Sequence, residues 1–335
     1  SLMDPLQENG NILRLVVRWK NERQPHTDTL PYPGMKILVT GSSGTIGTHL
    51  CDTLLKRGDS VVGMDIVPNK WLPSVQDVTI LGDLRKKEDF SKLPKDIDIV
   101  IHLGANARVY ELVEDPDRAM DNFITLFNTL EFCRKNGVKK FLFASSREGY
   151  GNIHADTYTE DMVRVENCES PYTASKVGGE ALVHAYEKCY GIDSIIFRFS
   201  NVYGMYDDSV RVVPLFIRKA RKGEQLTVFG NKCLDFTYID DAIHGLLCAI
   251  DRFDDAKGDT YNIAYGEGNT IVKLAEMINA HFGSTAGVDL GSIRTGEISR
   301  YVADISKAKT KLGYTPKISF DEGVRKSIEW YTANT

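Results

Sequence analysis

The sequence has no long hydrophobic run and no excess of positive charge. Its 335 residues contain no uninterrupted apolar stretch of about 18 residues, the length that a membrane-spanning helix needs. The 41 Lys and Arg are outnumbered by 46 Asp and Glu, so the formal net charge is −5. Proteins that bind nucleic acid usually carry a basic surplus instead. The sequence therefore predicts neither a membrane protein nor a nucleic-acid-binding protein.

Cysteines are also few, and they are scattered. The six of them include no Cys-x-x-Cys pair, the spacing typical of metal and redox sites. We expect reduced thiols, no metal site and a cytoplasmic location. Residues 1–34 lack the apolar core and cleavage site of a signal peptide, and we interpret them as an appendage before a fresh start at Met35.

What the sequence does contain is a regular alternation of short apolar runs and longer helical patterns. The runs are rich in Val, Ile and Phe, and most are too continuous for strands with one exposed face. They occupy residues 36–40, 60–65, 78–83, 98–104, 139–146 and 193–200. The helical stretches 45–58 and 121–137 each end at a glycine that suits a helix C-terminus. This alternation predicts an α/β fold with a doubly wound, Rossmann-type parallel sheet.

The pattern loosens after residue 200. Residues 210–223 and 270–283 are expected to form helices, with short strands between them. We interpret this part as a smaller C-terminal α/β lobe. The predicted boundaries are a first domain at 35–202, to which 231–264 return, and a lobe made of 203–230 and 265–335.

A glycine-rich turn follows the first predicted strand. Gly41, Gly44 and Gly47 stand between that strand and the first helix. Glycines at this spacing allow a tight turn and let the backbone approach a dinucleotide pyrophosphate, which sits on the helix N-terminus. Asp65 ends the second strand, where a carboxylate can bind the ribose hydroxyls and would repel a 2′-phosphate. The sequence thus favours NAD over NADP. Asp83, after the third strand, could reach the adenine edge.

Tyr172 and Lys176 stand four residues apart at the start of a long helical pattern, residues 170–190. Side chains at this spacing share one helix face. The same spacing also occurs at Tyr32 and Lys36, where intervening Pro and Gly residues break a helix. The spacing alone therefore leaves open whether Tyr172 and Lys176 act together.

Several motifs together make the chain resemble the extended short-chain dehydrogenase/reductase family, the NAD-dependent nucleotide-sugar epimerases and dehydratases. The resemblance runs from about Met35 to Trp330. Its motifs are "TGSSGTIG" at 40–47, "GDLR" at 82–85, "HLGA" at 102–105, "SSREGYG" at 145–151, "YTASK" at 172–176, "RFSNVYG" at 198–204 and "RTGEISRYVADISKAKTKLGYTP" at 294–316. They follow the order that the family shows.

The resemblance implies a role for each motif. Tyr172 is expected to be the catalytic acid/base, with Lys176 beside it and Ser146 bonded to the reacting sugar oxygen. The predicted NAD-binding residues are Gly41, Ser43, Gly44, Thr45, Ile46, Gly47, Asp65, Asp83, Leu84, Leu103, Gly104, Ala105, Asn122, Tyr172 and Lys176. The predicted substrate-binding residues are Ser146, Arg147, Asn201 and Arg294. The lobe is then the substrate-binding part, and the substrate a nucleotide sugar, with a UDP-sugar expected first.

The implied reaction starts with hydride abstraction from a sugar carbon, C4 by expectation. Return of the hydride to the other face gives epimerisation, as in UDP-glucose 4-epimerase, which is our main prediction. Glu148 keeps open a nucleotide-sugar 4,6-dehydratase or a UDP-glucuronate decarboxylase, because both carry a Glu there. Arg147 departs from the dehydratase acid at its position. A small-carbonyl reductase and a non-catalytic NAD-binding protein are the remaining alternatives.

Leu234 is a second departure from the family. It occupies the position of an arginine that grips the nucleotide diphosphate, and Lys232 or Arg211 could replace that contact. The family resemblance also implies a homodimer, built on the helices around 117–134 and 172–190.

Overall fold

The computed structural model of this protein describes residues 34–335. Our interpretation of residues 1–34 as an appendage lies outside the described residues, apart from Gly34. The described residues form one compact unit that begins with the first predicted strand.

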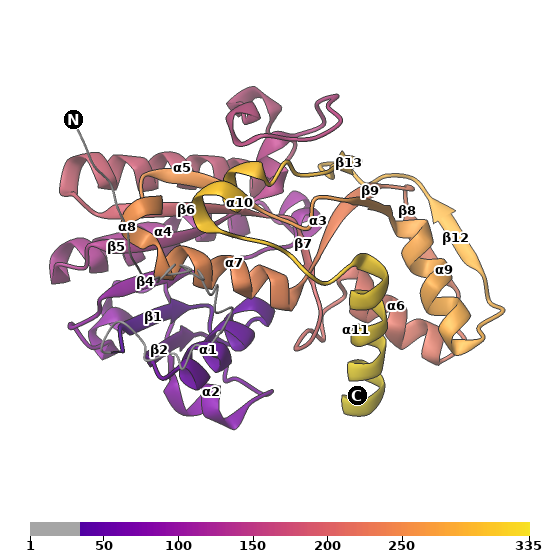
Figure 1. Ribbon diagram of the computed structural model, residues 1–335, viewed down its shortest axis with the longest axis horizontal. Coiled ribbons are helices and arrows are strands. Elements are labelled where there is room, and N and C mark those ends of the chain that lie inside the picture. Colours follow the sequence, from indigo (N-terminus) through magenta and orange to yellow (C-terminus); the bar gives the residue numbers. More distant parts are fainter. Residues whose placement is uncertain (1–33) are drawn as a thin grey trace, which may run out of the picture. The chain divides into compact units, whose positions relative to one another are not determined.

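A seven-stranded parallel sheet forms the centre of this unit (Figure 1). Its strands lie in the order β3-β2-β1-β4-β5-β6-β10. They are β1 (Lys36–Thr40), β2 (Ser60–Asp65), β3 (Thr79–Leu81), β4 (Ile99–His102), β5 (Lys140–Ser146), β6 (Asp193–Phe199) and β10 (Asp259–Ile263). The order reverses between β1 and β4, and ligands bind beside such a point at the carboxyl ends of the strands. The predicted fold class is confirmed.

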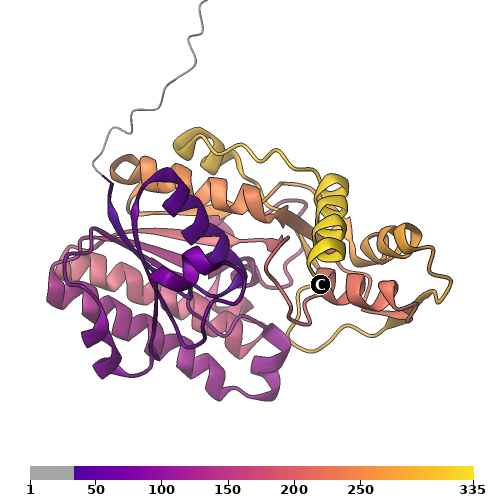
Figure 2. The same ribbon diagram turned by 90° about the horizontal axis from the view of Figure 1, so that it is seen from below.

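Helices cover both faces of the sheet, as Figure 2 shows. α4 (Asp117–Asn136) and α5 (Pro171–Tyr190) lie on one face, and α1 (Thr45–Arg57) and α7 (Ile239–Asp251) on the other. α1 and α4 each end at a glycine with a positive φ, as the sequence predicted, and α5 also ends at such a glycine, Gly191. Shorter helices connect the layers: α2 (Pro73–Val78), α3 (Val109–Glu114), α8 (Phe253–Ala256) and α10 (Ser306–Leu312).

The lobe lies beyond the carboxyl edge of the sheet (Figure 1). Its helices are α6 (Val212–Arg221), α9 (Ile271–Phe282) and α11 (Phe320–Asn334). Two small sheets complete it: β8 (Leu226–Phe229) with β12 (Val288–Gly291), and β9 (Cys233–Tyr238) with β7 (Asn201–Tyr203), β11 (Gly268–Thr270) and β13 (Arg300–Tyr301). A continuous apolar core joins the sheet to the lobe, so the structure does not divide them at a defined residue. The predicted domain boundaries stay a prediction; they are 35–202 with 231–264, and 203–230 with 265–335.

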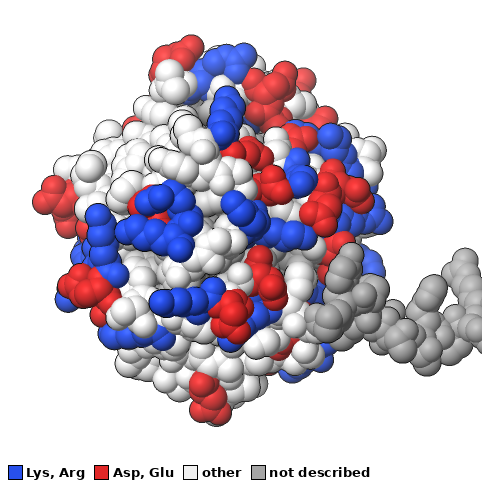
Figure 3. All heavy atoms as spheres, turned by 90° about the vertical axis from the view of Figure 1, so that its left-hand side faces the viewer, with Lys and Arg blue, Asp and Glu red and all other residues white. Residues whose placement is uncertain are grey.

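No helix within residues 34–335 is long and apolar enough to cross a membrane. No group of three or more His, Cys, Asp or Glu side chains in this range is arranged to hold a metal ion. On the face drawn in Figure 3, acidic and basic side chains are interspersed rather than gathered into a patch of one sign.

Candidate active site

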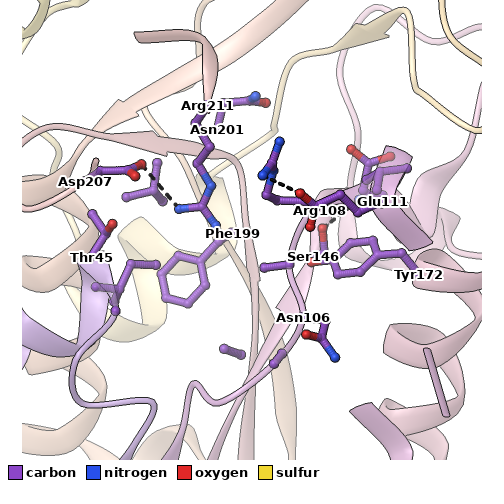
Figure 4. A pocket seen from close by; sticks show the side chains of 18 of the residues that line it. Thr45, Asn106, Arg108, Glu111, Ser146, Tyr172, Phe199, Asn201, Asp207 and Arg211 are labelled. Carbon is purple, nitrogen blue, oxygen red and sulfur yellow. Dashed lines mark hydrogen bonds and ion pairs between the residues drawn. The ribbon is translucent and has the colours of Figure 1, made fainter. Parts of the chain in front are cut away.

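A cavity of about 750 Å³ lies at the carboxyl ends of the central strands. The glycine-rich turn lines it on one side, and the start of α6 and the end of β8 line it on the lobe side. In Figure 4, Ser146 and Tyr172 lie side by side on one wall, and Arg211 and Asp207 lie across the cavity from them. The glycine-rich turn and the lobe, which are far apart in the sequence, thus line the same cavity.

The three glycines of the turn have different reasons to be glycine. Gly41 has a φ of 73°, and a Cβ there would lie 2.8 Å from the amide nitrogen of Gly104. A Cβ on Gly47 would lie 2.0 Å from the carbonyl oxygen of Gly41. The fold itself therefore requires both residues.

Gly44 differs, because nothing in the protein excludes a side chain there. Its φ is −74°, and a Cβ would meet only the Gly41 oxygen, at an ordinary 3.4 Å. Gly44 lines the cavity at the N-terminus of α1, where backbone amides face an anion. The missing side chain leaves room for a ligand, and the residues present fit the pyrophosphate of a dinucleotide.

Asp65 is fixed by the backbone of the same turn. Its carboxylate accepts hydrogen bonds from the amides of Ser43, at 2.9 Å, and Val67, at 3.1 Å. Burial raises the pKa of Asp65, and these amides oppose the shift. Ile66 and Val67 follow it with exposed, apolar side chains. No cation stands directly after Asp65 to receive a 2′-phosphate.

The other predicted cofactor residues line the same cavity. They are Ser43, Thr45, Ile46, Leu84, Leu103, Gly104 and Ala105, together with Asp83 and Asn122. Asp83 accepts hydrogen bonds from the guanidinium of Arg85 at 2.9 and 3.0 Å, which lowers its pKa. Its carboxylate is therefore only partly free for a ligand.

Asn122 connects two parts of the site. Its amide oxygen accepts a hydrogen bond from the Asn106 backbone at 2.7 Å, and its amide nitrogen donates to the Asn106 carbonyl at 3.0 Å and to the Ser175 hydroxyl at 3.1 Å. These bonds tie the loop after β4 to α5. Asn122 thereby positions the loop as well as lining the cavity.

Ser146, Tyr172 and Lys176 come together as the motifs predicted. Ser146 ends β5, and Tyr172 and Lys176 stand one turn apart at the start of α5. Ser170 caps this helix by accepting a hydrogen bond from the Thr173 amide at 3.1 Å. All three predicted catalytic side chains are buried and line the cavity. The helix start therefore holds Tyr172 against the strand end that carries Ser146.

Burial dominates the protonation of this group. It raises the pKa of Tyr172, while a hydrogen bond with Ser146 opposes the shift. It lowers the pKa of Lys176 to about 8. The Lys176 ammonium donates to the Ala144 carbonyl at 2.7 Å and lies 5.9 Å from the centre of the Tyr172 ring. A tyrosine that acts as a base near pH 7 needs a pKa below its ordinary value of about 10, and a positive nicotinamide ring beside Tyr172 would favour such a lowering.

Arg147 and Glu148 form an ion pair directly after Ser146. A guanidinium nitrogen of Arg147 lies 2.8 Å from the Glu148 carboxylate. Burial raises the pKa of Glu148, and Arg147 and Lys232 oppose the shift. Both side chains line the cavity. The predicted substrate residue and the predicted optional base are therefore coupled to each other.

Three cations, Lys232, Arg211 and Arg294, line the same cavity as Leu234, which is buried. Lys232 pairs with Glu297 at 2.7 Å, so it is already engaged. Arg211 precedes α6 and lies 3.6 Å from Asp207, a loose contact that leaves it half-exposed. Arg294 lines the cavity as predicted. Of the two predicted replacements for the missing arginine, Arg211 is therefore the less engaged within the protein.

Two aromatic residues of the site were not predicted. The Arg294 guanidinium lies 3.7 Å from the centre of the Phe229 ring and 4.8 Å from that of Tyr110. Phe229 ends β8 and keeps 38% of its surface exposed, and it lines the cavity. A ring that stacks on a planar cation also offers a face to a nucleotide base. Only the tertiary structure brings these residues together.

Known proteins are similar to this chain in sequence and fold. A family described as "NAD dependent epimerase/dehydratase family" matches residues 37–264. A putative UDP-glucose 4-epimerase of Methanocaldococcus jannaschii is 33% identical over 89% of this chain and 99% of its own. The crystal structure of UDP-glucuronic acid 4-epimerase from Bacillus cereus, in complex with UDP-glucuronic acid and NAD, matches with a TM-score of 0.83. It is 31% identical and covers 90% of this chain and all of its own.

A UDP-glucose 4-epimerase from Thermus thermophilus in complex with NAD matches similarly. Its TM-score is 0.81 at 29% identity, over 90% of this chain and all of its own. The chain belongs to the NAD-dependent epimerase/dehydratase family. The predicted family is therefore confirmed, and its cofactor is NAD.

Proposed function

We propose that this protein is an NAD-dependent UDP-sugar 4-epimerase. The observation that carries the proposal is the single cavity that joins the glycine-rich turn, the Ser146–Tyr172–Lys176 group and the Arg211, Arg294 and Phe229 side of the lobe. Some relatives are named for UDP-glucose and others for UDP-glucuronate, which supports a UDP-sugar as the class of substrate.

The mechanism assigns a separate task to each side chain. Bound NAD⁺ supplies the acceptor for a hydride from C4 of the sugar. Tyr172 takes the proton of the C4 hydroxyl, and Ser146 holds the same oxygen by a hydrogen bond. Lys176 stabilises the Tyr172 phenolate by its opposite charge. Tyr172 would return the proton to the C4 oxygen when C4 regains a hydrogen on its opposite face.

The lobe side suits the UDP part of the substrate. Arg211 and Arg294 supply charge-assisted hydrogen bonds to the diphosphate, each worth roughly 1.5–3 kcal/mol. Phe229 offers a stacking face to the base, and Asn201 presents an amide oxygen that has no hydrogen-bond partner within residues 34–335. A UDP-sugar would thus span the cavity from Phe229 to Tyr172.

The contact between Arg147 and Glu148 favours epimerisation over elimination. The Arg147 guanidinium lies 2.8 Å from the Glu148 carboxylate and opposes the rise of its pKa, so it lowers the proton affinity of Glu148 and weakens it as a general base. The test is to incubate the protein with NAD⁺ and a panel of UDP-sugars and to analyse the products by mass and NMR. An epimerase leaves the mass unchanged. A product lighter by one water or one carbon dioxide would instead establish a dehydratase or a decarboxylase.

NAD⁺ is expected to bind more tightly than NADP⁺, because a 2′-phosphate would meet the Asp65 carboxylate. Like charges at a binding interface cost several kcal/mol, so the ratio of dissociation constants should be on the order of 100-fold. Calorimetry with both cofactors at one salt concentration measures it, and Asp65→Asn should narrow the ratio. Equal affinities in the unaltered protein would remove Asp65 from the cofactor site.

A homodimer built on α4 and α5 is part of the proposal. Met120, Ile124 and Phe127 form an exposed apolar stripe along α4, with 58%, 39% and 38% of their surfaces exposed. The neighbouring helix α5 exposes the small residues Ala174, Ala181 and Ala185. Sedimentation at micromolar concentration should show a dimer, and Ile124→Glu should shift it to monomer. A monomeric unaltered protein would refute the dimer. Cytoplasmic location stays a prediction.

A further inference from the structure

The ion pair of Arg147 and Glu148 is incomplete. Only 10% of the Arg147 side chain and 6% of the Glu148 side chain are exposed, and the pair uses one nitrogen and one oxygen. The second guanidinium nitrogen, Nη1 of Arg147, and the second carboxylate oxygen, Oε2 of Glu148, are buried and have no hydrogen-bond partner within the described part of the chain. Unpaired buried polar atoms of charged groups are costly.

The chemistry of these two atoms indicates which ligand group could form hydrogen bonds with both of them. Nη1 can only donate a hydrogen bond, and an ionised Oε2 can only accept one. Both residues line the cavity and directly follow Ser146, which contacts the reacting oxygen in the proposed mechanism. A sugar hydroxyl carries both a donor and an acceptor, so one hydroxyl or two adjacent hydroxyls can complete the pair.

The surrounding charges disfavour a carboxylate at this place. The groups that act on Glu148 are Arg147, Lys232, Glu297 and Glu169. Together with Glu148 itself, these are two cations and three carboxylates, a formal charge of −1. Lys232 is held by Glu297 at 2.7 Å, and Arg147 by Glu148. Each cation of this group already faces one carboxylate, so a further carboxylate would raise the local negative charge.

The structure of the sugar shows which of its substituents lie next to the reacting carbon. Ring carbon C4 has two carbon neighbours, C3 with its hydroxyl and C5 with the C6 group. With Ser146 at the C4 oxygen, the pair that follows it would lie near the C3 hydroxyl and the C6 group, and of these only the C6 group differs in charge between the two kinds of sugar. In a hexose C6 is a neutral hydroxymethyl group, and in a uronic acid it is a carboxylate.

We propose that the Arg147–Glu148 pair is a specificity determinant that selects UDP-hexoses with an uncharged C6 group and rejects UDP-uronates. This inference rests on the proposed function. It assigns the protein to one of the two substrate classes that its relatives' names contain.

Binding tests the proposal without relying on turnover. The NAD⁺-loaded protein is titrated calorimetrically with UDP-glucose and with UDP-glucuronate, which share the UDP part. UDP-glucose is expected to bind on the order of 100-fold more tightly, since a like charge at an interface costs several kcal/mol. Equal affinities, or tighter binding of UDP-glucuronate, would overturn the proposal.

Glu148→Gln removes the charge and keeps the shape of the side chain. The affinity ratio should fall below about tenfold, mainly because UDP-glucuronate binds more tightly. Glu166→Gln, the same change at an exposed residue outside the cavity, is the matched control and should leave the ratio unaltered. An unaltered ratio in Glu148→Gln would show that Glu148 does not set the preference.

Turnover of the same two substrates separates the inference from the proposed function. Faster epimerisation of UDP-glucose supports both. Epimerisation that prefers UDP-glucuronate refutes the inference alone. No epimerisation of either sugar refutes the proposed function, and the binding ratio still decides whether the pair discriminates against a carboxylate.

Discussion

Replacing Tyr172 with phenylalanine is expected to lower kcat by roughly 10²–10⁴-fold, the usual contribution of a positioned acid or base. The change removes one hydroxyl from a side chain that is buried against α3 and α4. The ring remains to fill the same space, and the glycine-rich turn is not touched. The dissociation constant for NAD⁺ should therefore change little. Steady-state kinetics with UDP-glucose and calorimetry with NAD⁺ measure the two quantities.

Tyr190→Phe is the matched control, because Tyr190 lies on the same helix but is exposed and outside the cavity. Its kcat should stay close to that of the unaltered protein. If Tyr172→Phe kept most of the activity, the acid/base would have to be another group. If it lost cofactor binding to the same degree as activity, the tyrosine would have a structural role instead.

Replacing Glu180 with alanine is expected to lower the free energy of unfolding by about 3–5 kcal/mol, because it leaves a buried cation without its partner. The Glu180 carboxylate accepts two hydrogen bonds from Arg198, at 2.9 and 2.7 Å, and one from Ser145 at 2.5 Å. Both charged side chains are buried. Urea denaturation followed by circular dichroism measures the loss.

Glu329→Ala provides the comparison at the surface. Glu329 pairs with Arg325, and more than half of each side chain is exposed, so the cost should stay below about 1 kcal/mol. Equal losses for the two variants would contradict the importance of burial. Glu180 stands one turn beyond Lys176 on α5 and joins that helix to β5 and β6. The Glu180–Arg198 pair therefore also stabilises the position of α5, which carries Tyr172 and Lys176.

Local sequence patterns predicted most of the sheet domain. The six predicted apolar runs correspond to β1–β6, because strands buried on both faces need continuous apolar residues. The glycines that end α1 and α4 were equally predictable, because the left-handed backbone conformation at a helix C-terminus favours glycine. The seventh strand, β10, was not singled out, because its "DTYNI" is short and mixes polar with apolar residues.

The lobe and the side-chain contacts of the site were harder to predict from the sequence. β9 pairs with β7, β11 and β13, which come from three separate parts of the chain, and no local periodicity encodes such pairing. The engagement of Asp83 by Arg85 and the stacking of Arg294 on Phe229 depend on side-chain positions in space. Adjacent opposite charges in a loop can pair, as Arg147 and Glu148 do, but the sequence does not show that this pair is buried.

The most direct test of the account follows the hydrogen on C4. The protein is incubated with UDP-glucose that carries deuterium at C4 and with unlabelled NAD⁺, and the product is analysed by NMR and mass spectrometry. A hydride that leaves C4 and returns to C4 predicts UDP-galactose of unchanged mass, with the deuterium retained at C4 and its configuration inverted. A product that has lost its deuterium to solvent, or that is lighter than the substrate by more than the label, would contradict the account.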